Sequence, residues 1–301
     1  MAYLFVHFIG EQHLGEQIYF SLSRDGLHWT DLNNGQPTLI TQIGTCGVRD
    51  PFPIRDPRTG MVYIIGTDLC IGSGTGWGDA VTVGSRDLFV WKSADLIHWE
   101  GPEAHTVGIP EAGCVWAPEA VYDREKEEFF IFFASHVKYA TDEAPKHRIY
   151  SVTTKDFETF TDAKLYIERE NHIIDTTILE DSGKYYRISK NESIKRLDLE
   201  VSESLEGPFT PLHSPTFESL YGVEGPEGYL LPDGETWCVI ADQFAAGKGY
   251  LPMVTKDLSS GDFRILSEGE YDLGQTKKRH GGILPITDEE YDRMLSHYSQ
   301  D

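Results

Sequence analysis

The sequence is short of basic residues: 26 lysines and arginines stand against 49 aspartates and glutamates, which gives a formal net charge of −23. A surface of this sign repels phosphate backbones and anionic lipid headgroups. We therefore expect neither nucleic acid nor a membrane among the partners of this protein. The charge fits a soluble enzyme that handles a neutral or cationic substrate.

Cysteine is scarce as well, and the four residues at positions 46, 70, 114 and 238 form no Cys-x-x-Cys pair of the kind that binds zinc or performs redox chemistry. No apolar run reaches the length of a membrane span. The opening segment Met1–Ile9 has no basic start and no cleavage site, so it predicts a strand and not a signal peptide. We expect a cytoplasmic protein, with a secreted mature form as the alternative.

Helical periodicity is nearly absent, and short strand-like runs separated by turn residues take its place. Two signatures recur along the chain. The first places a hydroxyl residue and an acid shortly before an aromatic residue, as in Ser23–Trp29 and Ser93–Trp99, with weaker copies at Thr154–Phe160, Ser202–Phe209 and Thr255–Phe263.

The second signature is a polar residue, a short apolar run, a turn, and a β-branched or aromatic run. Its five copies open at Asp50, Glu119, Asp175, Glu224 and His280. Units of about 50 to 70 residues with three or four strands have the scale of β-propeller blades. The sequence therefore predicts an all-β, five-bladed β-propeller.

The two ends of the chain supply complementary parts of one unit. The strand-like run Tyr3–Phe8 and the first aromatic signature lie at the N-terminal end, and the opening run Gly281–Ile286 has no successors. Pairing these segments would close the ring without exposed edges, so we expect residues 1–301 to form a single catalytic domain. Only Thr287–Tyr291 predicts a short helix.

First strands of propeller blades line the central axis, so the five openings should meet at one mouth. Four acids would then surround a cleft. Two carboxyl groups on opposite sides of a cleft, one protonated and one ionised, are what glycoside hydrolysis requires.

At the level of motifs, the chain resembles glycoside hydrolase family 43, the five-bladed propellers that cleave arabinofuranosides, xylosides and related linkages. The matching segments, one per blade, are Arg49-Asp50-Pro51, Trp116–Glu119, Ile174-Asp175, Glu224-Gly225-Pro226 and Arg279-His280-Gly281. The family usually has Asp where this chain has Glu119, and Asp-Pro where it has Asp175-Thr176.

The resemblance implies roles for three carboxylates. Asp50 corresponds to the general base and Glu224 to the general acid, while Asp175 corresponds to a third acid that orients Glu224 and raises its pKa by its negative charge. Glu227 is a weaker candidate for the acid, because it lies an odd number of residues further along the strand. No cofactor is expected for catalysis. The resemblance implies a calcium or other ion near His280, bound directly or through water, and the alternative is a hydrogen-bonded core histidine.

Further candidates would contact the sugar, although the aromatic ones could equally pack between blades: Trp116, Glu119, Phe52, Trp77, Tyr221 and Arg279. The segment Gly72–Gly78 is similar to a dinucleotide-binding loop, but Trp77 stands where glycine is needed and we expect no helix after it. We interpret it as a rim loop.

By resemblance, the expected activity is that of an inverting glycosidase acting on an arabinose- or xylose-containing oligosaccharide. We expect an α-L-arabinofuranosidase, with β-xylosidase or β-D-galactofuranosidase as alternatives. The alternative from another class is a non-catalytic carbohydrate-binding propeller. Sucrose- and fructan-cleaving propellers fit less well, because the chain lacks their Asn-Asp-Pro nucleophile and Glu-Cys acid motifs.

Overall fold

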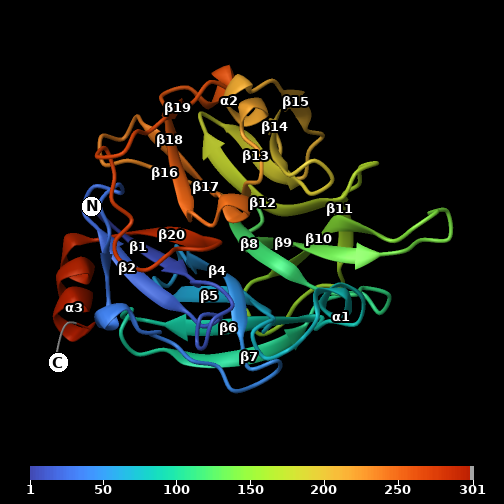
Figure 1. Cartoon of the computed structure of the whole chain (residues 1–301), viewed down its shortest axis with the longest axis horizontal. Coiled ribbons are helices and arrows are strands. Elements are labelled where there is room, and N and C mark those ends of the chain that lie inside the picture. Colours follow the sequence, from blue (N-terminus) through green and yellow to red (C-terminus); the bar gives the residue numbers. More distant parts are fainter. Residues whose placement is uncertain (299–301) are drawn as a thin grey trace.

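A computed structural model describes residues 1–298 as five four-stranded antiparallel sheets arranged around a central axis (Figure 1). The sheets are called blades I to V. Contacts between successive inner strands run around the ring from β4 to β8, β12, β16, β20 and back to β4. The predicted five-bladed propeller is confirmed.

Blades I and II follow each other along the chain, each running from its inner to its outer strand. Blade I contains β4 (Val48–Arg55), β5 (Val62–Asp68), β6 (Asp87–Ser93) and β7 (Glu100–Thr106). Blade II contains β8 (Trp116–Asp123), β9 (Glu128–Val137), β10 (Lys146–Thr154) and β11 (Lys164–Ile167).

Blades III and IV have the same strand order. Blade III contains β12 (Ile173–Asp181), β13 (Lys184–Asn191), β14 (Arg196–Ser202) and β15 (Thr210–Leu212). Blade IV contains β16 (Glu224–Leu230), β17 (Trp237–Asp242), β18 (Tyr250–Thr255) and β19 (Arg264–Ile265).

Blade V is built from both ends of the described chain, as the two incomplete repeats predicted. It contains β20 (Gly281–Ile286), β1 (Ala2–His7), β2 (Tyr19–Ser23) and β3 (Thr30–Asp31). The inner strand β20 pairs antiparallel with β1, from Ala2 opposite Ile286 to His7 opposite Gly281. This pairing closes the ring, and it gives β1 a partner on the side that β2 does not cover.

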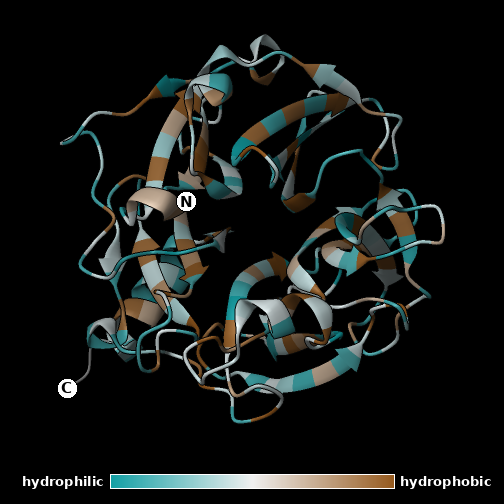
Figure 2. Ribbon diagram, turned by 45° about the vertical axis from the view of Figure 1, so that its right-hand side comes forward, coloured by the Kyte–Doolittle hydropathy of each residue, from teal (hydrophilic) through white to brown (hydrophobic). Residues whose placement is uncertain are grey.

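The core is divided into five apolar clusters, one at each interface between neighbouring blades. Tyr63 of blade I packs with Phe129 of blade II, for example, and Phe5 of blade V packs with Tyr250 of blade IV. The brown and teal segments along the strands in Figure 2 show where apolar and polar residues lie. Because the second strand of each sheet is covered on both faces, it is rich in buried β-branched and aromatic residues, whereas the outer strands β7 and β19 have no buried residue.

The first repeated signature forms the turn after the third strand of a blade. In blade I the Ser93 hydroxyl accepts from the Leu96 amide at 2.9 Å, and Asp95 Oδ1 accepts from the amides of Ile97 and His98 at 2.9 and 2.8 Å. Thr154 and Asp156 repeat these contacts in blade II. The acid of this signature therefore caps a turn after the third strand and does not lie on the inner strands around the axis.

Three α-helices and three short 3-10 helices complete the part of the chain that the structure describes, residues 1–298. The helices are α1 (Trp77–Thr82), α2 (Pro215–Ser219) and α3 (Asp288–Tyr298), with η1 (Asn33–Gly35), η2 (Phe244–Ala246) and η3 (Leu258–Ser260). Within residues 1–298, no helix has the length and apolar character that crossing a bilayer requires.

Helix α3 confirms the predicted C-terminal helix and extends beyond the expected Tyr291. Thr287 and Glu290 cap it reciprocally: the Glu290 amide donates to Thr287 Oγ1 at 3.1 Å, and the Thr287 amide donates to Glu290 Oε2 at 2.8 Å. Tyr291 and Met294 bury its inner face against blades V and I. Helix α1 corrects the expectation that no helix follows the glycine-rich segment, because Gly76 is its N-cap.

Candidate active site

The same irregularity interrupts four of the five inner strands near the mouth of the axial channel. The pairing register shifts after Arg49 in β4, after Trp116 in β8, after Ile174 in β12 and after Glu224 in β16. Each bulge contains a residue in the left-handed region, with φ of +50° at Asp50, +48° at Ala117, +47° at Asp175 and +51° at Gly225. A bulge re-aims the side chain that it carries.

Aligning the blades on these bulges corrects the assumption that four acids share one repeat position. Asp50 and Asp175 are equivalent bulge residues, and Glu224 comes one residue before its bulge. Glu119 lies after the bulge, at the position of Glu227. The acids therefore occupy different levels of the inner strands.

A cavity of about 580 Å³ opens at this mouth, a size typical of small-ligand sites. It brings together seven of the ten predicted site residues from blades I to V: Asp50, Trp77, Trp116, Asp175, Glu224, Arg279 and His280. The Trp77 and Trp116 rings meet edge to face with centroids 6.0 Å apart, so these two residues form an aromatic wall.

Three predicted contact residues lie outside this cavity. Phe52 packs in the apolar cluster between blades I and II. Glu119 is buried in the axial channel below the mouth, and Tyr221 is 71% exposed. The cavity lining among residues 1–298 includes none of the three, so their predicted contact with the sugar is not supported by the geometry of the site.

Asp50 is held as an ionised carboxylate. Its Oδ1 lies 3.4 Å from His280 Nδ1, and its Oδ2 accepts from the Thr67 hydroxyl at 3.0 Å. Burial alone would raise the pKa of Asp50, but the contact with His280 and the charge of Arg49 lower it. An ionised acid at the mouth of the channel can act as a proton acceptor.

His280 lies between two acids. Its Nδ1 is 3.4 Å from Asp50 and 3.8 Å from Asp175. Burial opposes the charged ring, yet the charges of Asp175 and Asp50 raise the pKa of His280 to about 9. At neutral pH the ring is therefore an imidazolium that bridges the two carboxyl groups.

Asp175 has a different balance of forces. Burial is the largest effect and raises the pKa of Asp175 to about 6, although the charges of His280 and Lys190 act against it. Its Oδ2 accepts from the Gly225 amide at 3.2 Å. Gly225 is required there, because a Cβ atom would lie 2.6 Å from the His280 ring at a φ of +51°. Asp175 thus fixes the backbone beside Glu224.

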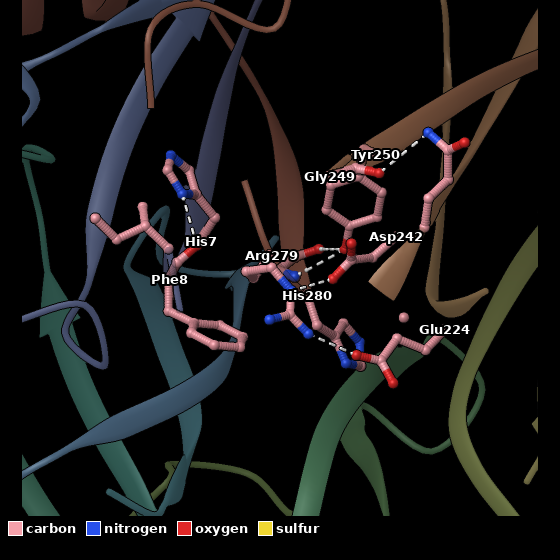
Figure 3. Close-up of polar contacts among 12 residues, drawn as sticks. His7, Phe8, Glu224, Asp242, Gly249, Tyr250, Arg279 and His280 are labelled. Atoms are coloured by element: carbon pink, nitrogen blue, oxygen red, sulfur yellow. Dashed lines mark hydrogen bonds and ion pairs between the residues drawn. The ribbon is translucent and has the colours of Figure 1, made fainter. Parts of the chain in front are cut away.

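The carboxylate of Glu224 forms ion pairs with two cations from different blades. Lys190 Nζ lies 2.7 Å from Oε2, and Arg279 Nη2 donates to Oε1 at 2.8 Å (Figure 3). Burial would raise the pKa of Glu224, but these two charges lower it. The pKa of Glu224 is therefore lowered and not raised as expected, because the two cations outweigh both burial and the repulsion between Glu224 and Asp175.

Sequence reasoning missed Lys190 and Asp242, which complete this network. Lys190 is buried at the end of β13 and contacts both Glu192 and Glu224 at 2.7 Å. Asp242 is fully buried at the end of β17 and binds Arg279 (Figure 3). A charged residue at the end of an otherwise buried second strand was the available signal in both cases.

Glu119 and Glu227 form a second, deeper pair of acids. Burial raises the pKa of Glu119 well above its usual range and that of Glu227 to about 8, and the charge of Glu227 adds to the shift at Glu119. Glu227 Oε1 accepts weakly from the Ile283 amide at 3.4 Å, and its Oε2 is buried without a hydrogen-bond partner among the described residues. This pair is neutral near pH 7.

An axial ion, which the resemblance implies, would meet these same groups. His280 is a poor ligand, because a protonated imidazole has no free lone pair. The carboxyl groups of Glu119 and Glu227 become the oxygen ligands that calcium prefers once they lose their protons, so binding of the ion there would release protons, and one Glu227 oxygen has no hydrogen-bond partner among residues 1–298. The ion remains a prediction, with Glu119 and Glu227 as the residues that would hold it.

A ring of five blades with three acids at its mouth defines the architecture of propeller glycosidases. The chain belongs to the family described as a probable glycosyl hydrolase domain, related to glycoside hydrolase family 43, whose model matches residues 1–292. The resemblance read from the five motifs is confirmed.

Three comparisons illustrate the relationship. An α-L-arabinofuranosidase of Bifidobacterium longum subsp. longum is 28% identical over 289 residues, which cover 81% of this chain and 27% of that protein. The chain thus spans about a quarter of the length of this curated relative. The solved α-L-arabinofuranosidase Arb93A of Fusarium graminearum has a TM-score of 0.58 at 14% identity, covering 87% of this chain and 74% of that one.

A thermostable family-43 glycoside hydrolase has a TM-score of 0.52 at 15% identity and covers 77% of this chain and 76% of that one. At these identities the two solved structures establish the shared propeller fold.

Proposed function

We propose that the protein is an inverting glycoside hydrolase that removes α-L-arabinofuranosyl groups from an oligosaccharide or polysaccharide. The observation that carries the proposal is the meeting of Asp50, Asp175 and Glu224, from three different blades, in one cavity with an aromatic wall. Family membership supports the hydrolase class, and the arabinofuranosidase relative supports the sugar.

The charges of the cavity favour a neutral sugar. The cations that line it are each paired with a carboxylate: Arg49 with Glu16, Lys190 with Glu192 and Glu224, Lys195 with Glu192, and Arg279 with Asp242 and Glu224. A uronate would have to compete with these internal partners. A neutral furanose needs only hydrogen bonds and a face to stack on, which Trp77 and Trp116 offer.

In the proposed reaction Asp50 accepts a proton from water as the water oxygen attacks the anomeric carbon. Glu224 gives a proton to the departing glycosidic oxygen. Attack from one side with departure from the other inverts the configuration. Asp175 positions Glu224 through the Gly225 amide and does not itself exchange protons with the substrate.

Glu224 must be protonated to act as the acid, whereas Lys190 and Arg279 favour its ionised form. We propose that sugar hydroxyl groups take over part of these cations' hydrogen bonding when substrate binds, so that Glu224 can gain a proton. Because the pKa values of Asp50 and Glu224 are both lowered, activity should peak on the acidic side of neutrality.

The test is a panel of 4-nitrophenyl glycosides: α-L-arabinofuranoside, β-D-xyloside and β-D-galactofuranoside. We expect the highest kcat/KM for the arabinofuranoside, and an anomerically inverted sugar as the first product seen by NMR. Retention of configuration would reject the mechanism. Binding of arabinosides without turnover of any substrate would favour the carbohydrate-binding alternative.

A further inference from the structure

Three histidines meet beside the candidate active site without a part in its proposed chemistry. His136 on β9 and His147 on β10 are directly opposite each other in the antiparallel register, so their side chains share one face of the sheet. His172 precedes β12 and joins them from blade III. The cluster therefore spans two blades.

The three rings are close enough to share one ligand. One nitrogen from each lies within 4.8 Å of one from each of the others. The Nδ1 atoms of His147 and His172 are 3.4 Å apart, which is about the edge of a tetrahedron with metal–nitrogen distances of about 2.1 Å. His136 and His172 are only partly buried, so their rings can turn to close the remaining separation.

One nitrogen of the cluster lacks a partner although it is buried. His147 is 7% exposed, and its Nε2 has no hydrogen bond within the described part of the chain. An unpaired buried nitrogen costs free energy, and no hydrogen bond on this side of the ring has to break when the other nitrogen, Nδ1, binds a metal. The His147 ring also stacks on Trp116, with centroids 5.5 Å apart.

The electrostatic surroundings keep the imidazoles neutral, which metal binding requires. Burial is the largest cause and lowers the pKa of all three rings, that of His147 to about 3. Four nearby cations oppose a metal, but each has its own acid: Lys146 with Glu168, Arg148 with Asp142, Lys190 with Glu224 and Lys195 with Glu192.

We propose that His136, His147 and His172 form a binding site for a divalent transition metal of the zinc type, which ties blade II to blade III behind Trp116. Three imidazole ligands with one open position suit Zn²⁺, Co²⁺ or Ni²⁺ and not the oxygen-seeking Ca²⁺ or Mg²⁺. The site is separate from the channel acids Glu119 and Glu227.

Titration of the chelator-treated protein with Zn²⁺ alone, followed by calorimetry, tests the site. We expect one Zn²⁺ per chain, and a loss of affinity of roughly a hundredfold or more in His136→Ala and in His172→Ala. His213→Ala, which changes an exposed histidine elsewhere, is the matched control and should bind as the wild type does. Asp50→Asn should bind equally well, because Asp50 lines the same cavity as His147 but contacts His280 and Thr67 and none of the three histidines.

Cobalt provides a readout that needs no variant. Co²⁺ in a tetrahedral nitrogen site should give intense visible absorption, which Zn²⁺ displaces, and should quench the fluorescence of Trp116. Weak absorption typical of six-coordinate Co²⁺, an absence of saturable binding, or Zn²⁺ affinity unchanged in both histidine variants would each overturn the proposal. The cluster would then be a hydrogen-bonded histidine stack.

Discussion

Acids lie at two levels of the inner strands, and the two on β16, Glu224 and Glu227, have pKa values shifted in opposite directions. Glu224 at the mouth contacts Lys190 and Arg279, and its pKa is lowered. Glu227, three residues further along β16, forms no ion pair within residues 1–298, and burial outweighs the charge of His280 and raises the pKa of Glu227 to about 8. A displacement of three residues thus separates an ionised carboxylate from a protonated one. Depth alone does not set the charge state, because the partners supplied by other blades decide it.

The largest expected effect compares the base at the mouth with an acid in the channel. Asp50→Asn removes the proton acceptor for water and should lower kcat roughly a thousandfold or more on every substrate. Glu119→Gln changes an acid that is already neutral, so activity should stay within a few fold of the wild type. Steady-state kinetics of both variants check the contrast, and equal losses would show that the channel acids take part in catalysis.

A second comparison separates the acid from the base. Glu224→Gln removes the proton donor, so the loss should be about a hundredfold or more for an alkyl or sugar leaving group and far smaller for an activated aryl group. Asp50→Asn should damage both substrates equally. A Glu224→Gln variant that loses the same factor on both kinds of leaving group would contradict the acid role.

The ion pair between Lys190 and Glu224 can be removed by a single substitution. Lys190→Met removes a positive charge 2.7 Å from the carboxylate, so the pKa of Glu224 should rise. Because the general acid works in its protonated form, the alkaline limb of kcat/KM should move to higher pH, by about one unit. Lys195→Met is the control: its amine contacts Glu192, and the limb should not move.

The smallest expected effect is a change in how the free energy of unfolding depends on pH. Glu227 binds a proton in the folded state up to about pH 8 but releases it near pH 4.5 when unfolded, so it makes the free energy of unfolding fall as pH rises between these values. In Glu227→Gln the free energy of unfolding should therefore fall less steeply with pH, by up to about 1.4 kcal/mol per pH unit. Urea unfolding of both proteins at pH 5 and pH 8 measures the difference. Identical slopes would mean that Glu227 is ionised in the folded protein.

The fold could be predicted because each blade repeats its turn chemistry and strand lengths in the sequence. The residues at the mouth could be predicted because Asp50, Asp175 and Glu224 sit beside motifs that open each repeat. Glu119 was misplaced because the bulge was not recognised. The prolines would have given the correct alignment of the inner strands, since Pro51, Pro118 and Pro226 each directly follow a bulge residue.

The ionisation of Glu224 could not be predicted from the sequence. Lys190 and Arg279 are distant from it along the chain and reach it only when blades III, IV and V assemble. Its charge state is a property of the folded ring. The histidine cluster is similar, because His172 joins the β9–β10 pair from another blade.

Because β20 and β1 must pair to close the ring, the time between their synthesis on the ribosome affects how the chain folds. The ribosome makes blades I to IV between β1 and β20, so at about 5–20 residues per second the first strand waits roughly 15 to 60 s for its partner. During this interval Tyr3 and Phe5, fully buried in the finished protein, lie on an unpaired edge. The nascent chain should therefore depend on chaperones until β20 has been made, and the earlier blades should fold before the first strand finds its place.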